Sequence, residues 1–337
     1  MKNKPADKPY CGCNPQQIEH AQPVINKDNL SMFMYVIRER YKIHLKKDVK
    51  HKKSPWTQDP IFRKYSFTNV RREHDKTTRW GISHIVNSDI PYEQKLLNLV
   101  LFRLFNKIET AEVLNLPFIM DDYTDWTQIE EEMLEYRKQF SAGYTFFTNA
   151  FLCGGLKAKL RAQFGKNLPP HIAVLRFSQY LSSHNFADRI IGCKSPTEVI
   201  GVLTSYSGIG EFLAYQIFVD FTYLQDFPFS ENEFTMAGPG AISGLNILFE
   251  KRNHLSYEEL IFWLRDNWYN FRELCDEKVF VDPKTMFYDI PEYDRVMNVM
   301  SIENCLCEFF KYYKAYNKIG RPRVKYKRRK RRQKKNA

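Results

Sequence analysis

The residues best suited to chemistry lie between Phe67 and Trp80, where charged and amide side chains recur at intervals of three or four. The segment has helical propensity, and this spacing would place one set on a single helix face: Asn69, Arg72, Asp75 or Lys76, and Arg79. Arginines on such a face can donate hydrogen bonds to a phosphate. The alternative is a surface helix whose charges pair with one another. A phosphate-binding cleft and a plain surface helix therefore both remain open.

A second candidate site is a glycine turn that two helices must position. Ser195-Pro196-Thr197-Glu198 combines a hydroxyl N-cap, an early proline and a capping glutamate, which predicts a helix start. Ser207, Gly208 and Gly210 then interrupt the helical spacing, which resumes afterwards. This is the order of a helix-hairpin-helix, whose exposed amides hold a nucleic-acid phosphate. Such turns are also common as plain joints between helices. A second glycine turn follows at residues 237–241.

The positive charge of the chain is concentrated at its end. Of the net charge of +12, residues 321–337 supply 11 Lys and Arg without an acid, so the other 320 residues carry about +1. Arg321 and Arg323 lie in a Gly-Arg-Pro-Arg segment that suits a narrow minor groove. The basic run that follows is of the nuclear-import type. We therefore expect the tail to bind DNA in a salt-sensitive way. We also expect the protein to be located in the nucleus, or in the host cell if a virus encodes it. The alternative is a tail that only increases solubility.

Periodicity predicts a mainly α-helical protein. With 43% hydrophobic residues in 337, the chain can bury one large core or two smaller ones. Residues 1–28 read as a flexible leader, residues 29–318 as the helical body and residues 319–337 as a disordered basic tail. Helices are predicted at residues 30–46, 93–107, 127–140, 171–183 and 302–317, and from the capping boxes at Ser195 and Ser256. No stretch approaches the roughly eighteen apolar residues of a membrane span.

Several chemistries are excluded by missing motifs. The seven cysteines are odd in number and follow no signal peptide, which favours a reducing compartment over a disulfide framework. Cys11-Gly12-Cys13 has no matching Cys or His pair, so no metal and no cofactor is expected. A P-loop, a Gly-x-Ser-x-Gly elbow, a His-Glu-x-x-His site and a Cys-x-x-Cys pair are all absent from the sequence. Catalysis must therefore rest on carboxylates, arginines and backbone amides.

Five blocks of the sequence resemble one family, the helical domain named after 5-hydroxymethyluracil DNA kinase. The family is also described as alpha-glutamyl/putrescinyl-thymine pyrophosphorylases or amino acid:DNA transferases. The blocks lie at residues 67–80, 98–106, 208–215, 238–246 and 305–312, and Gly320-Arg321-Pro322 follows the last of them. The resemblance implies a DNA-glycosylase-like helical fold. It also implies a transferase that acts on a 5-(phospho- or pyrophosphomethyl)uracil in double-stranded DNA, where an amine or amino acid displaces the (pyro)phosphate.

This implied reaction assigns roles to the candidate residues. The base must turn out of the duplex, a cation must stabilise the departing phosphate, and a carboxylate must deprotonate the amine. The expected catalytic residues are Asp75, Arg72, Arg79 and Glu233, the last being nearest to the place where helix-hairpin-helix glycosylases have an aspartate. The expected substrate-binding residues are Asn69, Trp80, Arg103, Asn106, Gly238 and Gly240. The expected DNA contacts are Ser207, Gly208, Gly210, Arg321 and Arg323.

Three functional hypotheses follow. The first is a DNA base-hypermodification enzyme whose substrate a partner 5-hydroxymethyluracil DNA kinase prepares. The second is a DNA glycosylase that releases a free base. The third is a non-catalytic module that binds modified DNA.

Overall fold

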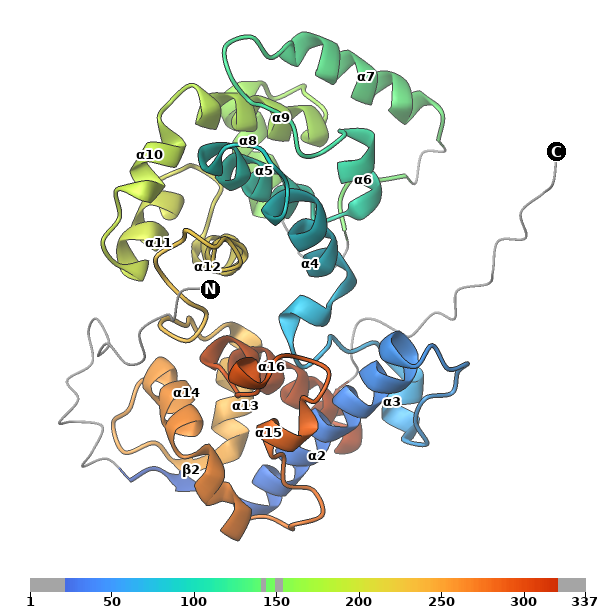
Figure 1. Cartoon of the computed structure of the whole chain (residues 1–337), viewed down its shortest axis with the longest axis vertical. Coiled ribbons are helices and arrows are strands. Elements are labelled where there is room, and N and C mark those ends of the chain that lie inside the picture. The colour runs from blue at the N-terminus through green and yellow to red at the C-terminus, as the bar shows by residue number, and fades with distance from the viewer. Residues whose placement is uncertain (1–21, 141–143, 149–153, 321–337) are drawn as a thin grey trace. The chain divides into compact units, whose positions relative to one another are not determined.

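The computed structural model describes residues 22–140, 144–148 and 154–320. The described residues fall into two compact units. Unit 1 comprises those between 73 and 236, and unit 2 comprises residues 22–72 and 237–320. Helices dominate both units (Figure 1), which confirms the predicted mainly α-helical class. Within the described ranges, none of the helices is long and apolar enough to cross a membrane.

Unit 2 is built from residues 22–72 and 237–320, whose blue and red helices lie side by side in Figure 1. Its helices are α2 (Lys27–His44), α3 (Pro60–Lys64), α13 (Pro239–Leu248), α14 (Tyr257–Asp266), α15 (Pro283–Met286) and α16 (Val299–Tyr316). The short strands β1 (Val24–Ile25) and β2 (Phe249–Lys251) pair antiparallel. Helices α2, α13 and α14 all pack against α16, so α16 is the centre of this unit.

The ends of the unit 2 helices follow from capping. Asn26 caps α2, Asn298 caps α16, and Ser256 forms the predicted capping box with Glu259. Strand β1 and the first residues of α2 lie within residues 1–28, the segment predicted as a leader. Residues 1–21 lie outside the described part of the chain. The predicted helical body, residues 29–318, extends over parts of both units.

Unit 1 surrounds the buried helix α5 (Tyr92–Phe105), which contacts α9 (Pro170–Ser182), α10 (Phe186–Ile191) and α12 (Glu211–Phe221). Its other helices are α4 (Lys76–Gly81), α6 (Ile108–Val113), α7 (Trp126–Lys138), α8 (Gly154–Phe164) and α11 (Pro196–Thr204). A π-helical turn, Ile82–Val86, extends α4. The predicted long helices are confirmed in both units, with boundaries shifted by a few residues, and the order helix, glycine turn, helix is found in unit 1 between α11 and α12.

The predicted helix over residues 67–80 is wrong. Only a 3-10 turn at Arg72–His74 and the short α4 are helical, and Asp75 is the N-cap of α4 with an extended backbone (ψ 137°). The break separates the candidates, since Arg72 belongs to unit 2 and Asp75 to unit 1. Their spacing therefore does not place them on one helix face. Tertiary anchoring of residues 67–72, described below, overrides their helical propensity.

Helices α13 and α16 approach closely through two glycines. A Cβ atom at Gly244 would lie 2.4 Å from the backbone oxygen of Leu306, and one at Gly240 would lie 2.4 Å from Sγ of Cys307. A side chain at Gly244 would force the helices apart because it would meet backbone, and one at Gly240 would have to displace the Cys307 side chain. Gly240 and Gly244 thus let α13 pack closely against α16.

We expect Gly244→Ala to lower the free energy of unfolding by about 1–3 kcal/mol, because the new methyl group overpacks the α13–α16 contact. Gly201→Ala in α11 is the control, since a Cβ there meets no atom within 4 Å. It should raise stability by about 0.5–1 kcal/mol. Urea unfolding of both variants measures the difference. Equal stability of Gly244→Ala and wild type would contradict the packing role.

Candidate active site

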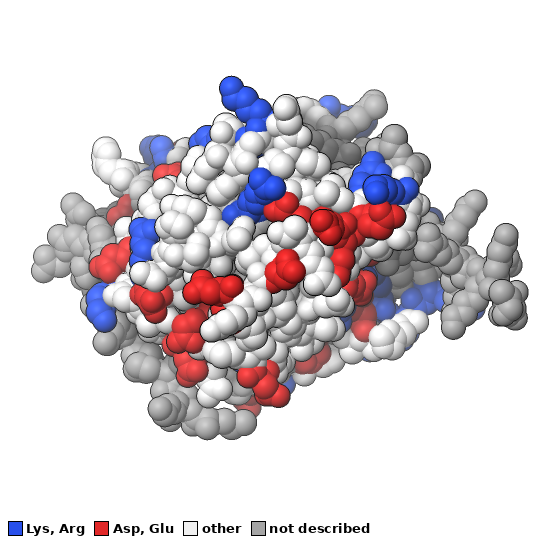
Figure 2. Space-filling model, turned by 90° about the horizontal axis from the view of Figure 1, so that it is seen from above, with Lys and Arg blue, Asp and Glu red and all other residues white. Residues whose placement is uncertain are grey.

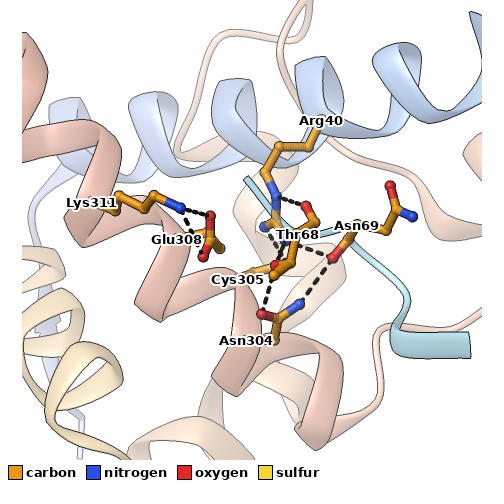
Figure 3. A network of polar contacts seen from close by, with 7 residues as sticks. All are labelled: Arg40, Thr68, Asn69, Asn304, Cys305, Glu308 and Lys311. Carbon is orange, nitrogen blue, oxygen red and sulfur yellow. Dashed lines mark hydrogen bonds and ion pairs between the residues drawn. The ribbon is translucent and has the colours of Figure 1, made fainter. Parts of the chain in front are cut away.

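A buried arginine anchors the segment that leads to Arg72. Arg40 on α2 donates from Nε to the carbonyl of Thr68 (3.0 Å) and from Nη2 to the carbonyl of Asn69 (2.7 Å). Its Nη1 also reaches Sγ of Cys305 on α16 (3.2 Å). Asn304 completes this network by donating to the same Asn69 carbonyl at 2.9 Å (Figure 3). The non-helical backbone at Thr68 and Asn69 is thereby fixed between α2 and α16.

The flanking residues of this segment are held as firmly. Arg71 is buried and donates to the carbonyls of Asp294 (3.1 Å) and Val296 (2.9 Å). At the other end, Lys311 Nζ lies 4.6 Å from the ring centroid of Phe67 and 3.1 Å from a carboxylate oxygen of Glu308. The residues that precede Arg72 are therefore held in place within unit 2, and Arg72 itself is half-buried.

Glu303 on α16 is the titratable group that Arg72 influences. The Gly238 N–H donates to Glu303 Oε1 (3.3 Å), and the adjacent Ala237 N–H donates to Glu258 Oε1 (2.9 Å). Burial raises the pKa of Glu303 to about 7, while the Gly238 hydrogen bond and the positive charge of Arg72 act in the opposite direction. A carboxyl group with this pKa can exchange a proton near neutral pH. The sequence did not identify Glu303 as a functional residue. The feature that could have identified it is a carboxylate on an otherwise apolar helix face.

The glycine turn before α13 was predicted to bind substrate through Gly238 and Gly240. In this structure the Gly238 amide holds a carboxylate, and Gly240 faces Cys307. Both glycines are therefore engaged inside unit 2. Their contribution to the site is indirect, because they place α13 against α16 and hold the Glu303 carboxyl.

Two thiols lie on the same helix as Glu303. Burial raises the pKa of Cys305, and it raises the pKa of Cys307 to about 12. Both groups are protonated at neutral pH, so neither offers a thiolate nucleophile. The acid-base chemistry of this region therefore rests on its carboxyl groups.

The predicted residues Arg79 and Trp80 line a hollow in unit 1. This open hollow of about 570 Å³ is bordered by Glu73, Lys76, Arg79, Trp80, Ile82, Ser83, His84 and Ile108. The Arg79 side chain is exposed and Trp80 is half-buried. Asp75 precedes the same helix as its N-cap. Asn69 belongs to unit 2, where its carbonyl joins the Arg40 network and its side chain points away from it (Figure 3).

Arg103 and Asn106 form part of the unit 1 core. Arg103 is 3% exposed and makes two hydrogen bonds to the buried Asp220, from Nε at 2.6 Å and from Nη2 at 2.5 Å. Its Nη1 donates to Asn106 Oδ1 at 2.8 Å. Asn106 also ends α5 in a left-handed conformation that asparagine tolerates well (φ 49°). These contacts assign both residues to the packing of α5 against α12.

The remaining candidates lie in loops of unit 1 or outside the described residues. Glu233 accepts a hydrogen bond from the Ser230 N–H (2.7 Å) and so closes its own turn. Gly208 has a φ of 101°, which favours glycine, and Gly210 is the N-cap of α12. Ser207 lines a second hollow of about 500 Å³ with Lys159 and Tyr180. Arg321 and Arg323 lie beyond the described range, which ends at residue 320. DNA binding by the turn stays a prediction.

Comparison with known proteins gives one family and one relative. The family model described as the helical domain of 5-hmdU DNA kinase matches residues 27–321. A protein of Bacillus phage SP10 named 5-hmdU DNA kinase is 25% identical over 298 residues, which cover 85% of this chain and 45% of the relative. The chain thus spans less than half the length of that relative. No solved structure matches the chain.

We expect Arg103→Met to lower the free energy of unfolding by about 3–5 kcal/mol, because Asp220 would remain buried without its main partner. Adding Asp220→Leu should recover much of this loss, since the lone charge is then removed as well. Urea unfolding of the two variants and of wild type measures this. A stable Arg103→Met protein with weakened DNA binding would instead support the original substrate-binding role.

Proposed function

Because the chain belongs to the family of the helical domain of 5-hmdU DNA kinase, we propose that it modifies a 5-substituted uracil base in DNA. The proposed reaction is a displacement at the methylene carbon attached to C5 of the base. The bond from this carbon to a phosphate or pyrophosphate oxygen breaks, and a bond to the nitrogen of an amine or amino acid forms. The phosphate leaves with the bonding electrons, and the amine loses one proton.

The observation that carries this proposal is that the positive charge of Arg72 acts on Glu303, a carboxyl group whose pKa is raised by burial. Glu303, with a pKa of about 7, is suited to accept the amine proton near neutral pH. Arg72, whose charge acts on that carboxyl, is suited to stabilise the negative charge on the departing phosphate. The two groups thus match the two charge changes of the displacement.

Unit 1 supplies the proposed DNA contacts. We propose that the hollow lined by Arg79 and Trp80 binds a DNA base, and that the turn around Ser207, Gly208 and Gly210 binds the DNA backbone. Asp75, at the start of α4, is an alternative proton acceptor. The surface that carries α7 is unsuited to DNA: Figure 2 shows acidic side chains across this face, and the exposed acids of this region are Asp121, Asp122, Asp125, Glu131, Glu132 and Glu135.

The proposed substrate requires a separate phosphorylation step. The SP10 relative is named a kinase, whereas this chain has no P-loop motif and matches 45% of that protein. We propose that a 5-hydroxymethyluracil DNA kinase activity outside this chain prepares the phosphorylated base. The basic residues from Arg321 onward are proposed to hold the protein on DNA, in a nucleus or in the host cell of a virus.

The direct test incubates the protein with DNA that contains 5-phosphomethyluracil, or its pyrophosphate form, and an amine such as putrescine. Digestion to nucleosides and mass spectrometry should reveal an amine adduct. Arg72→Ala should reduce adduct formation by roughly 100-fold or more, because the departing phosphate loses its cation. Lys138→Ala, which removes an exposed cation at the end of α7, should leave it unchanged.

Other outcomes of the digest would reject this function. Abasic sites in place of adducts would identify base excision. Unchanged DNA, bound by the protein in the presence of both co-substrates, would identify a non-catalytic binding module. Asp75→Asn and Glu303→Gln, assayed in parallel, identify the proton acceptor, since loss of adduct in Asp75→Asn alone would assign it to Asp75.

The rate of adduct formation should rise with pH through an apparent pKa near 7, the pKa to which burial raises Glu303. The rate rises with pH because the Glu303 carboxyl group must be deprotonated before it can accept the amine proton. Glu303→Gln should remove this dependence and most of the activity, while Glu131→Gln on α7 should retain both. A wild-type rate that stays constant between pH 5 and 8 would contradict the assignment.

A further inference from the structure

Three aromatic rings are stacked at the edge of unit 1. The ring of Trp80 lies parallel to that of His84, with centroids 4.3 Å apart and an interplanar angle of 7°. Trp80 also stacks on Phe102, with centroids 4.9 Å apart. Phe102 is buried and His84 is exposed, so the stack runs from the core of the unit to solvent.

Hydrogen bonds hold the outer ring of this stack in place. His84 Nδ1 lies 3.0 Å from the carbonyl oxygen of Trp80 and 2.8 Å from the hydroxyl of Ser83. Ser83 in turn donates to the Trp80 carbonyl at 3.1 Å. The imidazole therefore keeps its orientation over the indole without a ligand. A preformed ring surface of this kind loses little conformational entropy when another flat ring stacks on it.

The charges around the stack suit a nucleotide. His84 and Trp80 line the hollow of about 570 Å³ together with Lys76 and Arg79, which are both exposed. Proteins that bind single-stranded nucleic acid combine cations, which bind the phosphates, with aromatic rings, on which the bases stack. The same hollow contains one carboxylate, Glu73.

The ring contact by itself is not specific, because it recurs in unit 1. Tyr180 and His184 stack with centroids 3.9 Å apart, and His184 Nδ1 lies 2.8 Å from the Tyr180 carbonyl and 3.0 Å from the Ser183 hydroxyl. Both cases place an aromatic residue four positions before a histidine near the end of a helical segment. What distinguishes His84 is that its ring lines the hollow together with Lys76 and Arg79.

We propose that the exposed ring of His84, supported by Trp80, is a stacking surface for a DNA base that has left the duplex, with Lys76 and Arg79 binding the adjoining phosphates. This inference rests on the proposed function for the identity of the ligand as DNA. It adds a base-binding residue, His84, which the sequence did not indicate. The contact is one of stacking, so it accepts any base.

The test compares binding of a short thymidine oligonucleotide with that of an abasic oligonucleotide of equal length. Wild type should bind the thymidine strand roughly 5- to 100-fold more tightly, the range expected for stacking of one base. His84→Ala should lose most of this ratio, and His84→Phe should keep it because the ring remains. Quenching of tryptophan fluorescence by the thymidine strand should be absent in Trp80→Phe.

Matched variants separate stacking from charge and from folding. Lys76→Ala and Arg79→Ala should weaken binding of both strands in equal proportion, since phosphates are common to both. His184→Ala removes the equivalent ring elsewhere in the unit and should keep the wild-type ratio. A wild-type ratio near one, an unchanged ratio in His84→Ala, or an equal loss in His184→Ala would each overturn the proposal.

Failure of this inference can be distinguished from failure of the proposed function. The oligonucleotides carry no leaving group and no amine is present, so the binding ratio does not depend on chemistry. If the protein prefers the thymidine strand, if this preference requires His84, and if the digest contains no adduct, the stacking surface is supported and the transferase reaction is rejected. If His84→Ala still forms the adduct and its binding ratio is unchanged, the transferase reaction is supported and the stacking surface is rejected.

Discussion

The hydrogen bonds of the buried Arg40 guanidinium are the interaction on which unit 2 depends. A charged group removed from water must be satisfied by good partners, and Arg40 finds them in the carbonyls of Thr68 and Asn69 and in Cys305. These partners come from segments far apart in the sequence. Satisfying one buried charge therefore brings α2, residues 67–72 and α16 together, and the position of Arg72 follows from it.

The close contact of α13 with α16 is the second constraint, and it determines the electrostatics of the site. Because Gly240 and Gly244 let the helices touch, the first amide of the α13 turn meets the Glu303 carboxyl. Glu303 is half-buried, and its burial raises the pKa of its carboxyl group to about 7.

The sequence predicted the helices well because their signals are local. Ser195 and Ser256 mark helix starts through side chains within three residues, and α5 shows its buried face through spacing alone. The segment 67–80 misled because its helical propensity was overridden by Arg40, a partner some thirty residues earlier in the chain. The hydrogen bonds of Arg103 could not be predicted, because Asp220, its partner on α12, is distant in sequence.

The site itself was only partly predictable for the same reason. Arg72, Arg79 and Trp80 could be singled out from residue type and from the family resemblance. Glu303 and His84 could not, because their properties arise from burial against Gly238 and from stacking on Trp80. A raised pKa is a property of the folded environment, and no residue pattern encodes it directly.

The most direct test of the central claim is a titration of the Glu303 carboxyl by NMR in protein labelled with 13C at the glutamate carboxyl carbons. The signal is assigned as the one missing from Glu303→Gln. We expect an apparent pKa near 7 in the folded protein, and a further rise in Arg72→Ala, because the arginine charge favours the ionised form. A value near the ordinary glutamate pKa of 4.5, unchanged by Arg72→Ala, would contradict the claim that these two residues form the reactive pair.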